Sequence, residues 1–229
     1  MMEVVETPSQ ADRMPTDEMI IRLFWIVDDE LQMVNNRSDA HLYPSEIGTI
    51  GLLSAFKGGR FRAFHRWLHA NYRHLFPELP ERSRLQRLIG EYAELADYFL
   101  KQPSVFTVVD TYGIELIHAR REGRSPRQIG RKGKSNGRWI VGIKLGWLIN
   151  DAGYGVNWGW DTAEAPDNAF RTIATRYKDE TIALCDFGFR ERGEEQHNLK
   201  FCERGRWNER FVIETNLSWV TERFNAKKL

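Results

Sequence analysis

Two aspartates each end an apolar run that has the composition of a buried strand. Asp110 closes the run FTVVD, and Asp186 closes IALCD directly before Phe187-Gly188-Phe189. Carboxylates at the C-terminal ends of strands point into the crevice where α/β sheets place their chemistry. Aspartate also closes many strands simply as a turn residue, so each aspartate alone is weak evidence of a site.

A third carboxylate, Glu214, lies in the segment 206–220, which has helical periodicity. At about 100° per residue, Ile213 and Leu217 fall on one apolar stripe and Glu214 falls at its border. Arg210 lies one turn earlier, so the two residues could form an exposed ion pair worth about 0.3 kcal/mol. Alternatively, Arg210 orients a carboxylate that reaches towards the two aspartates.

Three carboxylates brought together indicate a particular chemistry. Massed acids repel one another and raise one another's pKa values unless a cation neutralises them. Hard divalent cations take oxygen ligands, and magnesium combines carboxylates with phosphate oxygens and water. Two such ions about 3.5–4 Å apart can clamp the attacking and leaving oxygens of a phosphoryl transfer. The acids therefore indicate metal-dependent phosphoryl transfer, with two Mg²⁺ or Mn²⁺ ions as cofactors.

Basic residues are concentrated in two blocks of a chain whose formal net charge is only +1. The first block holds eight Lys and Arg and two acids, at 57, 60, 62, 66, 73, 82, 84, 87 and at 78, 81. The second holds nine against one acid, at 120, 121, 124, 127, 131, 132, 134, 138, 144 and at 122. Such blocks favour a polyanion-binding surface, and the alternative is that they only keep these segments soluble.

The chain changes character near Pro103. Residues 1–15 are polar, contain two prolines and lack periodicity, which is typical of a disordered tail. Apolar residues at helical spacing then predict helices from Thr16, after Pro44 with Ser45 as the cap, over 61–76 and over 81–100. We therefore expect a region at 16–102 that is entirely helical.

The second half contains β-branched and aromatic runs bounded by turn residues, which predict strands. We expect a strand or hairpin at 104–117, strands at 138–151 and 154–163 around a turn at Ala152-Gly153, a helix at 167–177, a strand ending at 186, and a helix from 208. The basic stretch 120–137 is rich in Gly, Ser, Pro and Asn, which argues against regular structure. The predicted fold class is α+β or α/β, in the order β, β, β, α, β, α behind the helices.

Four tryptophans lie in the strand-patterned segments, at Trp139, Trp147, Trp158 and Trp160. We expect them to be core and sheet-face residues, since aromatic side chains suit a half-buried pleated surface. The alternative is that one of them stacks on a nucleic-acid base.

The three acids and their contexts resemble the DDE transposases of bacterial insertion sequences, which have an RNase H-like core. The acids follow in the same order, 76 (186 − 110) and 28 (214 − 186) residues apart. The segment around Glu214 is similar to the family's C-terminal signature, Tyr-x2-Arg-x3-Glu-x6-Lys. The matching positions here are Trp207, Arg210, Glu214 and Thr221, so the lysine's DNA contact is missing unless Arg223 replaces it.

Two other segments carry the same resemblance. The DFGF sequence at 186–189 is similar to the Asp-x-Gly-Tyr/Phe that surrounds the second acid in these enzymes. The segment 60–88 resembles their N-terminal helical region, including its Leu-Pro-x-Arg-Ser/Thr-Arg turn. Together with VDTYGIELIHARR, the resemblance covers residues 20–229.

The resemblance implies a DNA-binding helical region at 16–102 and, at 103–229, an RNase H-like mixed sheet with flanking helices. It implies that Asp110, Asp186 and Glu214 hold the metal ions, with Arg210 supporting Glu214. The implied activity is cleavage of double-stranded DNA at the element's ends and transfer of the freed 3′-hydroxyl into target DNA by a homodimer. The implied DNA contacts are Arg82, Arg84, Arg87, Arg120, Arg121, Arg124, Arg127, Arg131, Lys132 and Lys134.

Two alternatives to this activity stay open. The chain stops fifteen residues after Glu214 (229 − 214), whereas family members continue, so we expect a C-terminally truncated copy. Such a copy could be a catalytically inactive DNA-binding remnant, and an RNase H-like nuclease with another substrate is the second alternative. Two cysteines without metal-ligand spacing and the lack of a membrane-spanning apolar run favour a cytoplasmic protein without a membrane partner.

Overall fold

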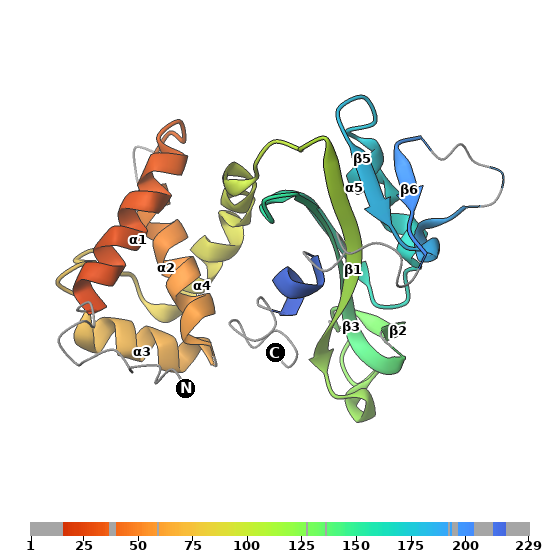
Figure 1. Cartoon of the computed structure of the whole chain (residues 1–229). Coiled ribbons are helices and arrows are strands. Elements are labelled where there is room, and N and C mark those ends of the chain that lie inside the picture. Colours follow the sequence, from red (N-terminus) through yellow and green to blue (C-terminus); the bar gives the residue numbers. More distant parts are fainter. Residues whose placement is uncertain are drawn as a thin grey trace, which may run out of the picture. The chain divides into compact units, whose positions relative to one another are not determined.

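The computed structural model describes residues 16–36, 40–58, 60–126, 128–135, 137–191, 193, 197–203 and 213–218. The chain divides into two units, Met1–Tyr98 and Phe99–Leu229. Helices and a curled mixed sheet make it an α+β structure (Figure 1). Within the described ranges, every helix is too short or too polar to cross a lipid bilayer.

The elements up to Phe99 are α1 (Thr16–Leu31), α2 (Pro44–Lys57), α3 (Phe61–Asn71), α4 (Arg82–Glu91) and the 3-10 helix η2 (Ala93–Phe99). Helical spacing of apolar residues buries one side of α1 at Ile20, Val27 and Leu31, as the sequence predicted. Each fully buried aliphatic side chain stabilises such a core by about 1.5–3 kcal/mol. The core contains Ile20, Leu42, Ile47, Ile50, Leu53, Phe64, Leu68, Phe76, Leu79 and Leu85.

The start of α2 differs from the sequence prediction. Tyr43 is the N-cap residue, and its backbone N–H donates to the Glu46 carboxylate at 2.8 Å. Ser45, which we expected to be the cap, lies inside the helix and donates its hydroxyl to Asp28 of α1. Proline suits the first helical position because its missing N–H is not needed there, so Pro44 begins the helix two residues earlier than expected.

The third and fourth helices are shorter than predicted. α3 ends at Asn71, where we expected it to continue to 76. The Asn71 side chain donates to the Trp67 carbonyl at 2.8 Å, and such side-chain bonds compete with continuation of a helix. The segment 81–100 forms two elements, α4 and η2, instead of one helix.

Glu46 provides a pH-dependent test of the first unit. Burial raises the pKa of the Glu46 carboxyl, the Tyr43 N–H lowers it, and the Glu78 carboxylate raises it, with a net upward shift. An acid with a raised pKa stabilises the fold at low pH and loses that contribution as the pH rises through its folded pKa. Glu46→Gln should therefore raise the unfolding free energy at pH 7, by an increment that shrinks as the pH falls towards 4.5. Thermal melts across this range measure it, and a pH-independent difference would contradict it.

Six strands form one mixed sheet in the second unit, and β1 lies at its centre. Pairing is antiparallel between β1 and β3, β2 and β3, and β3 and β4, and parallel between β1 and β5 and between β5 and β6. The strands are β1 (Phe106–Ile117), β2 (Arg131–Ser135), β3 (Arg138–Asn150), β4 (Gly155–Thr162), β5 (Ile182–Cys185) and β6 (Leu199–Phe201). The segment after Pro103 therefore forms one strand, and the hairpin alternative is wrong.

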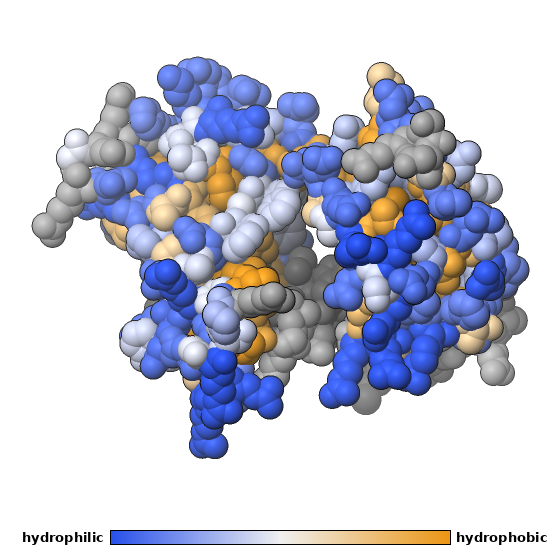
Figure 2. Space-filling model, turned by 180° about the vertical axis from the view of Figure 1, so that it is seen from behind, coloured by the Kyte–Doolittle hydropathy of each residue, from blue (hydrophilic) through white to orange (hydrophobic). Residues whose placement is uncertain are grey.

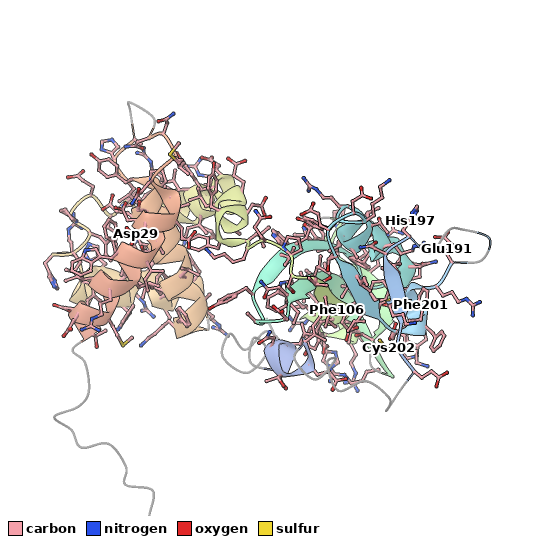
Figure 3. The ribbon with its side chains drawn as sticks, turned by 45° about the horizontal axis from the view of Figure 1, so that its top comes forward. Asp29, Phe106, Glu191, His197, Phe201 and Cys202 are labelled. Atoms are coloured by element: carbon pink, nitrogen blue, oxygen red, sulfur yellow. The ribbon has the colours of Figure 1, made fainter. Side chains whose placement is uncertain are left out.

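Short helices connect these strands. They are η3 (Ala119–Arg121), η4 (Asp167–Phe170), α5 (Arg171–Thr175) and η5 (Phe187–Phe189). The predicted turn before β4 is confirmed, with Gly153 at φ 84°, a backbone conformation that suits glycine. Phe106 begins β1, and Phe201 ends β6 directly before Cys202 (Figure 3).

The two faces of the sheet bury different residues, because side chains alternate along each strand. Val109 and Leu148 pack with Phe170 and Ile173, so η4 and α5 cover this side, which we call the α5 face. Val108, Ile149 and Leu184 pack on the other side with Ile213 and Leu217. Residues 213–218 are helical, and we call this second side the 213–218 face. The predicted disordered tail at 1–15 and the start of the last helix at 208 lie outside the described residues.

Two strands were missed by the sequence prediction, β2 and β6. β2 lies inside the basic stretch 120–137, where Gly and Ser content had argued against regular structure. Its glycine is required by close packing: a Cβ at Gly133 would lie 1.7 Å from the Ala163 carbonyl oxygen. Glycine in a strand often marks such an approach of another backbone, so here it signalled packing. β6 has only three residues, too few for a pattern.

Gly133→Ala should destabilise the second unit by about 2 kcal/mol, because the added methyl group forces the Ala163 backbone away. Gly159→Ala on β4 is the matched control, since its Cβ would meet Ile173 at 3.4 Å, an ordinary contact distance. Urea unfolding measures both. Equal stability of the two variants would contradict the close approach.

Hydrophilic side chains cover most of the surface seen in Figure 2, and apolar residues show between them in patches. Several large aromatic residues are exposed. Trp25 of α1 is 63% exposed, and Trp139 and Trp160 in the sheet are 64% and 56% exposed. All four tryptophans lie on sheet strands, as expected, and Trp147 packs against the buried cluster of the 213–218 face. Trp139, Trp158 and Trp160 are exposed, so they are not core residues.

Candidate functional site

The strand register places Asp110 beside Asp186. β1 and β5 pair in parallel, and the last paired residues are Val108 and Leu184. Asp110 and Asp186 each follow two residues later, and Asp186 keeps an extended backbone at φ −87° and ψ 175°. Neighbouring strands lie about 4.8 Å apart, so the two aspartates meet at one level of the sheet. Both side chains are half-buried.

Alternation along β1 shows which way Asp110 points. Val108 points to the 213–218 face, where it packs with Ile213 and Leu217. Residues two positions further along a strand point the same way, so Asp110 shares this face. Because β1 continues to Ile117, Asp110 lies inside the strand, and the expectation that it closes a strand is wrong. Asp186 directly follows β5, as expected, and caps η5.

Local hydrogen bonds orient both carboxylates. Asp110 Oδ1 accepts the Thr111 N–H at 2.7 Å, and Asp186 Oδ1 accepts the Gly188 N–H at 2.8 Å. The second bond caps η5, which explains the Asp-x-Gly sequence: a Cβ at Gly188 would lie 2.9 Å from Asp186 Oδ1 and 2.7 Å from Asp167 Oδ2.

Buried threonines hold the register of the two strands. Thr181 Oγ1 donates to the Val105 carbonyl and to Thr107 Oγ1, at 3.2 and 3.1 Å. The Ile182 N–H donates to the same Val105 carbonyl at 2.9 Å. Because these contacts lie at the start of both strands, they determine which residues meet at the other end.

Glu214 comes from the helix that packs on the same face. Ile213 and Leu217 are buried against the sheet, and Asn216 Nδ2 donates to the Gly153 carbonyl at 3.0 Å. Glu214 lies about 100° around the helix from Ile213, and its side chain is exposed. Arg210 lies outside the described residues, so the expected Arg210–Glu214 pair cannot be placed.

The structure places Asp110 and Asp186 on or directly after neighbouring strands, but its described residues do not gather all three acids. Among the described residues, no three His, Cys, Asp or Glu side chains converge closely enough to hold a metal ion. Magnesium in proteins is held by one or two carboxylates, completed by substrate phosphates and water. The aspartate pair fits that donor set, and Glu214 would have to reach over from the flank of its helix.

A buried ion pair, Lys144 with Asp167, lies on the α5 face of the sheet. The sequence analysis did not predict it. Lys144 of β3 is nearly buried, and its Nζ donates to Asp167 Oδ1 at 3.0 Å and to the Ala165 carbonyl at 2.6 Å. Thr111, the residue after Asp110, donates its hydroxyl to the same Asp167 oxygen at 2.6 Å. Asp167 also approaches the Asp186 turn at Gly188.

This group joins four elements: β1, β3, η4 and the turn that follows β5. Buried lysines are rare unless they are paired, so the Lys144–Asp167 ion pair marks a specific arrangement. The signal in the sequence was a single lysine among the apolar residues of β3, at a position that alternation assigns to the interior.

The basic residues expected to contact DNA are exposed wherever they are described. Arg120, Arg121 and Arg124 lie on and after η3, and Arg131, Lys132 and Lys134 lie on β2. Arg131 forms a 3.0 Å ion pair with Glu164, and Lys132 Nζ lies 5.6 Å from the centre of the Trp139 ring. Arg127 lies outside the described residues.

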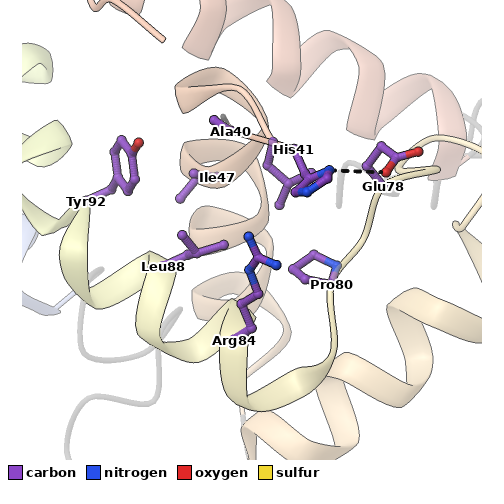
Figure 4. Close-up of a pocket in the computed structure, with 9 residues that line it drawn as sticks. Ala40, His41, Ile47, Glu78, Pro80, Arg84, Leu88 and Tyr92 are labelled. Carbon is purple, nitrogen blue, oxygen red and sulfur yellow. Dashed lines mark ion pairs between the residues drawn. The ribbon is translucent and has the colours of Figure 1, made fainter. Parts of the chain in front are cut away.

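The remaining expected contacts, Arg82, Arg84 and Arg87, are exposed on α4 of the first unit. Arg84 borders a cavity of about 230 Å³ that is also lined by Ile47, Leu88 and Tyr92 (Figure 4). At its edge, His41 Nδ1 lies 3.7 Å from the Glu78 carboxylate, and both side chains are mostly exposed. The cavity is small and mixed in charge, which indicates no particular ligand.

Comparison with known proteins gives no match to this chain among family models, curated proteins or solved structures. The function therefore has to be argued from the residues and their geometry.

Proposed function

We propose that this chain is a DDE-type transposase, which cleaves DNA strands by metal-dependent phosphoryl transfer and joins the freed 3′ ends to target DNA. The observation that carries the proposal is the aspartate pair. Asp110 lies within β1 and Asp186 directly follows β5, its parallel neighbour, and each has one oxygen oriented by a backbone N–H.

The sheet and its helices support an RNase H-like catalytic core at 103–229. Four strands with antiparallel pairing, β1 to β4, are followed by β5 and β6, which pair in parallel, and helices pack on both faces. This is the mixed sheet with flanking helices that the family resemblance implies. In this proposal the helices at 16–102 recognise the element's ends.

The proposed roles follow from residue type and position. Asp110 and Asp186 hold Mg²⁺ or Mn²⁺, with Glu214 as the third ligand and Arg210 orienting it. Such ions activate water and stabilise the charge that develops on the reacting phosphate. The exposed arginines and lysines of η3 and β2 contact phosphates, which gives affinity and salt dependence without sequence choice. Because two element ends must be cut together, the proposal includes a homodimer. It also includes a cytoplasmic location.

One observation favours a second candidate, a DNA-binding protein without cleavage. Glu214 is exposed, and the described acids do not form a group of three that could hold a metal ion. This candidate predicts salt-sensitive DNA binding and no strand cleavage. An RNase H-like nuclease with another substrate would cleave without joining ends.

The decisive experiment is nicking of supercoiled plasmid with Mg²⁺, Mn²⁺ or EDTA, followed by an assay for joining of cut ends to target DNA. The proposal expects nicking that requires the metal and joining that requires a 3′-hydroxyl. Nicking without joining would favour the nuclease. DNA binding that weakens with salt, without nicking under any metal, would favour the binding protein and overturn the enzymatic proposal.

A further inference from the structure

An aromatic surface lies beside the aspartate pair. Asp110 pairs with Trp147 across β1 and β3, and Trp147 pairs with Trp158 across β3 and β4. Directly paired residues point to the same face of a sheet, about 4.5–5.5 Å apart at their Cβ atoms. Asp110, Trp147 and Trp158 therefore form one row across three strands on the 213–218 face, and Asp186 follows β5 on the other side of β1.

The next row extends this aromatic surface. Tyr112 pairs with Leu145, and Leu145 pairs with Trp160. Trp158 is 38% exposed and Trp160 is 56% exposed, whereas Tyr112 and Trp147 are half-buried beneath the apolar cluster of this face. Large apolar side chains gathered on a surface mark an interaction site more often than single exposed ones do.

Basic residues continue along the same face. Lys132 pairs with Val141 and Lys134 pairs with Trp139, so both lysines point to the side of β3 that carries Trp147. Lys132 Nζ lies over the Trp139 ring. A cationic strand beside exposed aromatic rings is the combination that binds single-stranded nucleic acid, through phosphate attraction and base stacking.

We propose that Trp158 and Trp160 form a stacking platform for unpaired bases of the DNA strand whose phosphate lies at Asp110 and Asp186. Bases within a duplex already stack on their neighbours, so only a locally unpaired strand offers a free ring face. The lysines of β2 are positively charged and complement the negative charge of the DNA strand's phosphates. The inference deepens the proposed function and rests on it for the identity of the ligand.

The test measures binding of fluorescently labelled oligothymidine and of a duplex of equal length by the full chain. Trp158→Ala and Trp160→Ala should each weaken oligothymidine binding about tenfold, given the usual loss per stacked base, and change duplex binding much less. Tyr154→Ala is the control, because Tyr154 is an aromatic residue of the same unit that is 60% exposed but lies in the turn before β4, off the paired strand positions. It should bind both ligands like the wild-type chain.

A conservative variant separates stacking from folding. Trp160→Phe keeps an aromatic face and should bind within about threefold of wild type, whereas Trp160→Leu should resemble the alanine variant. Circular dichroism melts confirm that each variant is folded. If oligothymidine binding by Trp158→Ala and Trp160→Ala equals that of the wild type, the platform is overturned. Sedimentation velocity completes the test, because a change in oligomeric state with unchanged DNA binding would assign the surface to a second copy of the chain.

The outcomes also separate this inference from the proposed enzyme. Loss of oligothymidine binding in the tryptophan variants, combined with no plasmid nicking by the wild-type chain, would keep the platform and remove the transposase. Metal-dependent nicking by the wild-type chain, with unaltered oligothymidine binding in the variants, would keep the enzymatic proposal and overturn the platform.

Discussion

If the proposed activity is correct, we expect Asp110→Asn and Asp186→Asn each to lower the rate of metal-dependent DNA nicking by about a thousandfold. Asparagine keeps the oxygen that accepts the Thr111 or Gly188 N–H, so the local structure is retained while the negative charge is lost. A metal ion contributes several kcal/mol of transition-state stabilisation, and each 1.36 kcal/mol is a factor of ten in rate. Gel analysis of plasmid nicking over time measures the loss.

Asp161→Asn is the matched control for this prediction. Asp161 lies on β4 of the same sheet, is exposed, and its Oδ1 accepts the Thr162 N–H at 2.6 Å, the same local bond that Asp110 makes. It points to the α5 face, because it pairs with Lys144, and it should nick DNA at the wild-type rate. If Asp186→Asn nicks DNA as fast as Asp161→Asn, the aspartate pair does not hold the metal.

Lys144→Met lowers the unfolding free energy of the second unit by about 3 kcal/mol. The change removes the cation from Asp167 and the donor from the Ala165 carbonyl. Breaking a buried ion pair by removing one partner costs about 3–5 kcal/mol, and the low end applies because the Asp167 side chain is 32% exposed. Urea unfolding followed by tryptophan fluorescence measures it.

A double-mutant cycle tests whether the cost comes from the pair. Lys144→Met combined with Asp167→Asn should be more stable than Lys144→Met alone, since asparagine leaves no unpaired charge. Lys134→Met on the exposed side of β2 should change stability by less than about 0.5 kcal/mol. Strict additivity of the Lys144 and Asp167 changes would show that the two residues are not coupled.

Sequence patterns could predict that Asp110 and Asp186 each come after an apolar, β-branched run, because that pattern is local. They could not predict that the two runs pair in parallel, because three strands and the helices η4 and α5 lie between them in the sequence. The position of Glu214 could only be predicted as the border of a helical stripe. How far its carboxylate lies from the aspartates depends on side-chain reach and on how the helix packs, which periodicity does not determine.

The errors have a common physical cause. The composition of the segment that forms β2 predicted a loop, because glycine is common in turns. Glycine also occurs where another backbone approaches a strand closely. Only the packing of Gly133 against Ala163 shows which of these applies here. The same limit hid the link between Lys144 and Asp167, which are 23 residues apart and meet only after the sheet has formed. The sequence predicted that the tryptophans of β3 and β4 lie on the sheet, but it could not predict which of them are exposed. Their burial depends on which elements cover each face of the sheet.

The register held by Thr107 and Thr181 has a genetic consequence. β5 contains only four residues, and three of them pair with β1. Inserting or deleting one codon between Thr181 and Asp186 would reverse the direction of the aspartate side chain relative to the sheet, because side chains alternate with a period of two. Point substitutions at the exposed Ile182 would leave the acids where they are. Reading-frame-preserving indels in this stretch should therefore be far more damaging to the gene product than most single-base changes.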